Sequence, residues 1–176
     1  MKEHFVITVG REYGSGGRAI AKLVAQKLNV PFYDKELLTL AAQKSGICQE
    51  IFEHNDEKTT VSDMLPVTAG TGFGAGVGLG LQMPMNQRVF LAQFEVITNL
   101  AKEQSCVIVG RCADYVLRDM DHVTHIFLYA SLEKRVERIM RLEHVDADKA
   151  RELIRKTDKQ RKSYYNFFAD GNWGVR

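Results

Sequence analysis

Residues 7–28, ITVGREYGSGGRAIAKLVAQKL, decide the fold that we expect for this chain. A β-branched apolar run at 6–9 precedes a turn rich in glycine, and apolar side chains then recur at helical spacing from Ile20 to Leu28. A run that is apolar on both faces is typical of a parallel strand covered by helices on each side. The segment therefore predicts a buried strand, a tight glycine loop and an amphipathic helix.

The glycine loop predicts a binding site for phosphate. Backbone N–H groups of such a turn, backed by the N-terminus of a helix, attract anions without any side chain. We expect this role from Gly10, Gly14, Ser15, Gly16 and Gly17. The usual phosphate-loop pattern, GxxxxGK[ST], ends in a lysine and a hydroxyl, whereas here Gly17 and Arg18 follow Gly16. The positive charge of the lysine must then come from another residue.

Two arginines are candidates for that charge. Arg18 lies one position beyond the missing lysine and Arg11 lies at the start of the loop, and an arginine fork binds phosphate oxygens in bidentate fashion. The alternative for Arg18 is an exposed place in the first helical turn. A positive charge at that end of a helix is unfavourable unless an anion is present, so we favour phosphate contact.

A dinucleotide-binding fold is a competing interpretation of the same loop. Residues 14–19, GSGGRA, also fit the pattern GxGxxA, and Asp34 stands about where such folds place the acid that binds ribose. In those folds the first strand runs almost directly into the glycines, whereas the polar residues 10–13 intervene here. We therefore favour the phosphate loop.

The rest of the chain alternates predicted strands and helices. The predicted strands are 29–34, 106–110 and 125–130, and the predicted helices are 35–44, 49–55, 84–103 and 131–165, the last with a capping-box-like start at Ser131. This order predicts an α/β protein of three layers, a parallel sheet flanked by helices, over the single domain 1–176. Ligands of such sheets bind beyond the carboxyl ends of the strands, and Gly10, Asp34, Arg111 and Ser131 all lie at such ends.

Composition narrows the classes of function. A net charge of +2 on 176 residues gives no reason to expect a nucleic-acid polymer as partner, and no apolar stretch is long enough to cross a membrane. The start of the chain lacks a secretory signal, so we expect a cytoplasmic protein. Its three cysteines lack CxxC spacing, and His54 and Cys48 stand too far from other ligands to predict a metal site. The sequence leaves the oligomeric state open.

A glycine-rich segment interrupts the alternation. Residues 70–80 alternate glycine with small or apolar side chains, which suit neither a core nor a solvated linker. We predict a mobile flap at about 60–86, and its place between two ordered segments favours a role in binding. A disordered insertion without a function is the alternative.

Five segments of the chain are informative when taken together. They are GREYGSGGRAIAKLVAQKL at 10–28, FYDKELL at 32–38, CVIVGRCADYVL at 106–117, HIFLYASLEKRVERIM at 125–140 and IRKTDKQRKSYYNFF at 154–168. Together they resemble the cytidylate kinase-like family, relatives of the bacterial cytidylate kinases. The resemblance implies a P-loop kinase fold with an acceptor-binding flap and a helical lid at about 131–168. It also implies that a last core strand is missing after Arg176, because such domains continue past the NWG at 172–174.

The same resemblance implies that the protein transfers a phosphoryl group from the Mg²⁺ complex of ATP to a nucleoside monophosphate. CMP and dCMP are the first acceptors to test. Small nucleotides are then the partners. A nucleotide sensor without catalysis is the alternative from another class. Such transfer relies on alignment and on positive charge around the moving group, which arginines of a lid can supply.

Carried over position by position, the resemblance assigns residues 14–18 to the donor triphosphate. It places Asp34 and Arg111 at the acceptor nucleotide, and it implies lid or substrate contacts for Arg135, Arg138, Arg155, Asp158 and Arg161. The expected catalytic residues are Arg18, Arg111, Arg155 and Arg161. Two alternatives stay open: Asp34 is also a candidate helix N-cap, and Arg135 and Arg138 are also candidates for ion pairs with Glu133 or Glu137 on one helix.

Overall fold

The computed structural model describes residues 4–55, 57, 84–169 and 171–174, and within them it forms a parallel sheet of four strands. The strands are β1 (Val6–Arg11), β2 (Phe32–Tyr33), β3 (Cys106–Val109) and β4 (Val123–Leu128). Their order is β2-β3-β1-β4, and Val6 of β1 lies opposite both Cys106 and Val123. The predicted α/β class and parallel sheet are confirmed. Of the predicted flap, residues 60–83 lie outside the described part of the chain.

The strand order separates this fold from the dinucleotide-binding fold. In that fold the first strand lies between the second and the fourth. Here β3 lies between β1 and β2, so β1 has β3 and β4 as its neighbours. The GxGxxA match at 14–19 therefore lies in a different topology from the one that the pattern describes.

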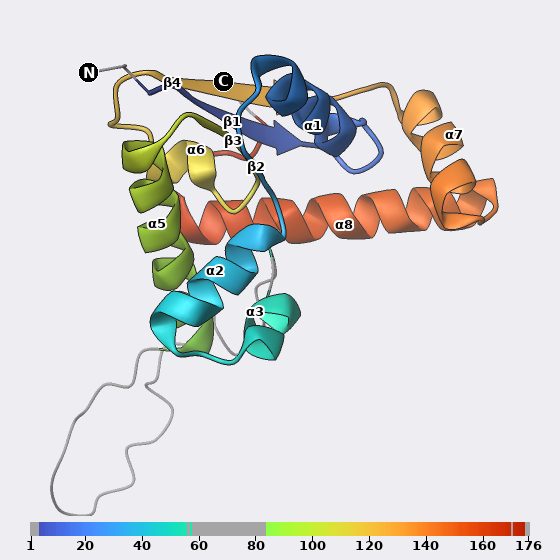
Figure 1. Cartoon of the computed structure of the whole chain (residues 1–176). Helices are drawn as coiled ribbons and strands as arrows, with labels where there is room; N and C mark the ends of the chain where they lie inside the picture. Colours follow the sequence, from blue (N-terminus) through green and yellow to red (C-terminus); the bar gives the residue numbers. More distant parts are fainter. Residues whose placement is uncertain (1–3, 56, 58–83, 170, 175–176) are drawn as a thin grey trace, which may run out of the picture.

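Helices cover both faces of the central strand β3, which explains why this strand is apolar throughout. On β3, Cys106 and Ile108 join one core cluster, whereas Val107 and Val109 join a second cluster on the opposite face. Figure 1 shows α1 (Gly17–Leu28) on one face, with α5 (Met85–Glu103), α6 (Ala113–Val116) and α8 (Ala147–Phe168) on the other. The four β3 side chains are fully buried, as expected for a strand between two helical layers.

Two short helices extend the larger core beyond the sheet. They are α2 (Glu36–Ser45) and α3 (Gln49–Asn55), and Gly46 ends α2 in the left-handed conformation that glycine favours, with φ of 68°. Leu37 and Phe52 are fully buried against α5. The predicted helices in this region are confirmed within two residues at their ends.

The long helical region predicted from Ser131 is divided into two helices. α7 (Leu132–Glu143) ends at His144, which has a left-handed φ of 54°, and α8 begins after Asp146. The Asp146 carboxylate caps α8 by accepting a hydrogen bond of 2.8 Å from the Lys149 backbone N–H. Ser131 occupies the N-cap position of α7, but its side chain makes no capping hydrogen bond, so the predicted capping box is wrong.

α7 lies beyond the sheet and folds back on the first half of α8 (Figure 1). Ile139 of α7 and Ile154 of α8 are buried in a small cluster that also takes up the ring of Tyr13 from the glycine loop. Among the described helices, none is long and apolar enough to cross a membrane.

Candidate functional site

The glycine loop between β1 and α1 has the geometry of a tight turn. Gly14 and Gly16 have left-handed φ values of 83° and 88°, which glycine adopts without steric cost. The Ser15 hydroxyl donates to the Glu12 carbonyl at 2.9 Å and accepts from the Gly17 backbone N–H at 3.3 Å. These bonds fix the loop in a compact form that leads directly into the N-terminus of α1.

A close contact across this loop explains why a lysine is missing from it. When GxxxxGK is aligned on Gly16, Arg11 stands at the first glycine and Gly17 at the lysine. A Cβ atom on Gly17 would lie 2.5 Å from the Cβ of Arg11, far inside van der Waals contact. An arginine at position 11 therefore leaves no room for any side chain at position 17.

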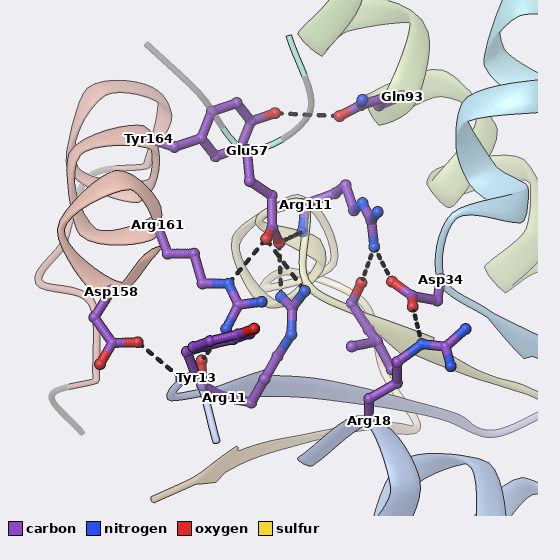
Figure 2. Close-up of polar contacts among 11 residues, drawn as sticks. Arg11, Tyr13, Arg18, Asp34, Glu57, Gln93, Arg111, Asp158, Arg161 and Tyr164 are labelled. Atoms are coloured by element: carbon purple, nitrogen blue, oxygen red, sulfur yellow. Dashed lines mark hydrogen bonds and ion pairs between the residues drawn. The ribbon is translucent and has the colours of Figure 1, made fainter. Parts of the chain in front are cut away.

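Asp34 joins two of the predicted arginines at the carboxyl end of β2. Its carboxylate accepts hydrogen bonds from Arg111 and, at 2.5 Å, from the Nε of Arg18 (Figure 2). Burial alone would raise the pKa of the Asp34 carboxyl, but Arg111 and Arg18 outweigh it and hold that pKa below its usual range. α2 has no side-chain cap, and its N-cap residue is Lys35, so the N-cap alternative for Asp34 is wrong.

The backbone after β3 is strained where it presents Arg111. Gly110, Arg111 and Cys112 have positive φ values of 73°, 54° and 54° in succession. Left-handed non-glycine residues are uncommon and cluster at functional sites. This turn directs the Arg111 backbone N–H toward the carboxylate of Glu57, at 3.2 Å, while its guanidinium reaches Asp34.

Glu57 is a carboxylate held at the centre of an arginine cluster. Arg11 binds both of its oxygens, at 2.6 and 3.1 Å, and the Nε of Arg161 donates to it at 3.1 Å (Figure 2). Burial would raise the pKa of Glu57, but Arg11, Arg111 and Arg161 together lower it far below the ordinary value. Sequence reasoning missed Glu57, because it follows the helix α3 without any motif around it and only the folded chain brings it to these arginines.

α7 contacts the glycine loop through two arginines. The buried Arg135 binds Asp158 of α8 and Glu12, the latter at 3.1 Å, and its Nε donates to the Tyr13 carbonyl at 2.8 Å. Arg138 donates from Nη1 to the Gly14 carbonyl at 3.2 Å. Within the described residues, the contacts of both arginines go to the loop and to α8 rather than to Glu133 or Glu137, so their alternative as helix ion pairs is not realised.

Most predicted site residues meet at one end of the sheet, and Arg155 does not. Its side chain is exposed on α8, and no hydrogen bond or ion pair in the described part of the chain joins it to the other candidates. A small cavity of about 30 Å³ lies beside the cluster, and Gly10, Arg111, Asp114 and Trp173 are among the residues that line it. Phe168 near the C-terminus packs in the core, since it stacks on Phe90 with ring centroids 4.2 Å apart.

No group of three or more histidine, cysteine or acidic side chains that could hold a metal occurs among the residues that the structure describes. Glu12 of the loop and Asp158, which accepts a hydrogen bond from the Tyr13 backbone N–H, both pair with Arg135. Mg²⁺ commonly binds through substrate phosphates and water rather than through a cage of protein ligands. These residues are therefore compatible with a magnesium ion that arrives with a nucleotide.

A parallel α/β sheet carries a glycine loop and a set of arginines at its carboxyl ends, an arrangement that suits the binding of an anionic ligand. The chain belongs to the cytidylate kinase-like family, whose model matches residues 6–176. It is also similar to the crystal structure of an uncharacterized protein from Eubacterium ventriosum, with 29% identity and a TM-score of 0.68, over 98% of this chain and 82% of that one. The comparison with curated proteins gave no match.

Proposed function

We propose that this protein transfers the terminal phosphoryl group of ATP, bound as its magnesium complex, to a nucleoside monophosphate. CMP and dCMP are the first acceptors to test. Family membership supports a nucleotide kinase type of activity, and the choice of donor and acceptor is our proposal.

The observation that carries the proposal is the binding of the Glu57 carboxylate. Two guanidinium groups and one backbone N–H converge on a single anionic group at the carboxyl ends of β1 and β3. A phosphate monoester accepts the same bidentate arginine contacts as a carboxylate and carries more negative charge. The acceptor phosphate would replace the Glu57 carboxylate there, between Arg11 and Arg161.

Each cluster then has a task in the transfer. The glycine loop and the N-terminus of α1 hold the donor phosphates through backbone N–H groups. Asp34 orients the guanidinium groups of Arg18 and Arg111 between the loop and the acceptor. Phosphoryl transfer depends mainly on alignment and electrostatic stabilisation, so arginines in fixed positions are the groups that the reaction needs. Magnesium, carried by the donor phosphates, would neutralise part of their charge.

A coupled assay of ADP release tests the proposal across a panel of nucleoside monophosphates. We expect turnover with at least one of them, and we expect Arg161→Gln to remove it because Arg161 lies in the acceptor cluster. Lys162→Gln is the matched control, because Lys162 is the exposed neighbour of Arg161 and its replacement should leave the rate unchanged. Absence of turnover with every nucleoside monophosphate in the folded protein would contradict the proposal.

A nucleotide sensor is the second candidate, because one observation favours it. Gly17 cannot carry the lysine that most phosphate loops use, since Arg11 fills the space for its side chain. Calorimetry with each nucleotide separates the two functions: tight binding of ATP and an acceptor without any turnover would select the sensor.

A further inference from the structure

We propose that Arg138 of α7 replaces the lysine missing from the glycine loop and binds the terminal phosphates of the nucleoside triphosphate. This inference rests on the proposed function and names the residue that supplies the charge at the donor. It assigns the role to a residue 122 positions after Gly16 rather than to a neighbour of the loop in sequence.

The Arg138 guanidinium lies against the glycine loop. Its Nη1 donates to the Gly14 carbonyl at 3.2 Å, and a Cβ atom added to Gly16 would collide with the same guanidinium. The side chain therefore lies directly over Gly16, the left-handed N-cap residue of α1. A phosphate held by the backbone N–H groups of this turn would be within reach of that guanidinium.

The other arginines near the loop are already paired with carboxylates. Arg11 is committed to both oxygens of Glu57, and Arg18 donates from Nε to Asp34. Arg135 is buried between Glu12 and Asp158. Each of these guanidinium groups already has a carboxylate partner.

Arg138 differs from them in its charge balance. No ion pair in the described part of the chain joins Arg138 to a carboxylate, and its side chain is half-buried. Its positive charge lies beside the N-terminus of α1, where the helix dipole adds further positive potential. This arrangement favours a bound anion at the loop, and the phosphates of a nucleotide are anions of sufficient charge.

The position of Arg138 is well defined by packing. The neighbouring Ile139 is buried in the cluster that joins α7 to α8, and a Cβ atom on Gly14 would touch both Ile139 and Arg135, at 3.1 and 3.2 Å. α7 therefore rests on the loop along one face. The loop lysine of other proteins is replaced here by a side chain of an adjacent helix.

The transfer itself requires no proton from Arg138. The bond from the bridging oxygen to the γ-phosphorus breaks and leaves its electron pair on ADP. A new bond forms between that phosphorus and a phosphate oxygen of the acceptor, which is already ionised at neutral pH because the second phosphate pKa is about 6. Arg138 contributes positive charge to the oxygens of the moving group and of ADP, the task that the loop lysine performs elsewhere.

Titration calorimetry with a non-hydrolysable ATP analogue and, separately, with the acceptor monophosphate tests this inference. We expect Arg138→Ala to weaken analogue binding by roughly tenfold or more, the effect of losing one charge-assisted phosphate contact. The affinity for the acceptor should change by less than about twofold, because Arg11 and Arg161 are unchanged in this variant. Such a change is well below the tenfold loss expected for the analogue. Arg141→Ala is the matched control, because Arg141 is exposed on the same helix and should leave both affinities unchanged.

Two further measurements keep the outcome decisive. Guanidinium ion added at millimolar concentration should restore analogue binding to Arg138→Ala, which a purely structural role would not allow. If Arg138→Ala does not fold, Arg138→Lys keeps the stem and the charge but loses the fork, and we expect it to fold and to bind the analogue more weakly than wild type.

The result that overturns the inference is an unchanged analogue affinity in Arg138→Ala, or in Arg138→Lys if only that variant folds. An equal loss for the analogue and for the acceptor would also overturn it. Wild-type protein that binds the analogue without any turnover would contradict the kinase function alone, because affinity for the analogue does not depend on turnover. Wild-type protein that binds no triphosphate would contradict both.

Discussion

Replacement of Asp34 with asparagine should destabilise the protein strongly, because it removes the negative partner of a buried arginine. The side chains of Asp34 and Arg111 are only 5% and 2% exposed, whereas Arg18 is 60% exposed. Removal of one partner of a buried ion pair costs about 3–5 kcal/mol, because a buried charge loses an ionic interaction that water cannot replace. In a chain of this length, 1 kcal/mol corresponds to about 2–4 °C in Tm, so we expect Tm to fall by roughly 6–20 °C.

Thermal unfolding followed by circular dichroism measures this effect, and Asp119→Asn supplies the matched control. Asp119 pairs with Arg118 at 3.4 Å, but the two side chains are 83% and 48% exposed. Exposed pairs of this kind contribute about 0–1 kcal/mol. If Asp34→Asn lowers Tm no more than Asp119→Asn does, the burial argument for the Asp34 cluster is refuted.

Two further predictions concern pH and thiol chemistry. The pKa values of Asp34 and Glu57 are lowered in the folded protein, so their stabilising contribution is complete above the unfolded values of about 4 and is lost as pH falls further. Tm measured from pH 7 to pH 3 should therefore drop steeply below about pH 4, and a Tm that stays constant down to pH 3 would contradict this expectation. Of the three cysteines, only Cys48 is exposed, while burial raises the pKa of Cys106 to about 11 and raises that of Cys112 still further. A thiol reagent should therefore modify Cys48 rapidly in the native protein and all three cysteines in denaturant, and mass spectrometry identifies the modified site. Rapid modification of Cys106 or Cys112 in the native protein would contradict this prediction.

The fold could be predicted from sequence where local patterns determine it. The apolar run at 6–9, the glycines after it and the helical spacing up to Leu28 are local signals, and β1, the loop and α1 match them. The place of β3 between β1 and β2 depends on contacts between distant segments, so periodicity could not predict it. The division of the last helical region at His144 was missed, because a left-handed histidine carries no strong sequence signal.

The candidate site was predicted to the extent that strand ends determine it. Carboxyl ends of parallel strands meet at one edge of a sheet, and this rule correctly predicts that Asp34 and Arg111 lie close together. The rule gives no information on side chains that arrive from helices packed at that edge. The contact of Arg138 with the loop depends on the packing of α7 against α8 and the loop, and the contacts of Glu57 depend on where the chain runs after α3. No spacing in the sequence encodes either arrangement.

The contact between Arg11 and Gly17 has a consequence for the routes by which such a loop can change. Gly17→Lys alone places a Cβ atom 2.5 Å from the Arg11 Cβ, and Arg11→Gly alone deprives the buried Glu57 carboxylate of its bidentate partner. Each single step toward a lysine-bearing loop is therefore unfavourable, although the double replacement removes the collision. Positions 11 and 17 are coupled by steric exclusion, so a lysine-bearing loop and a lysine-free loop are two separate solutions divided by a mutational barrier.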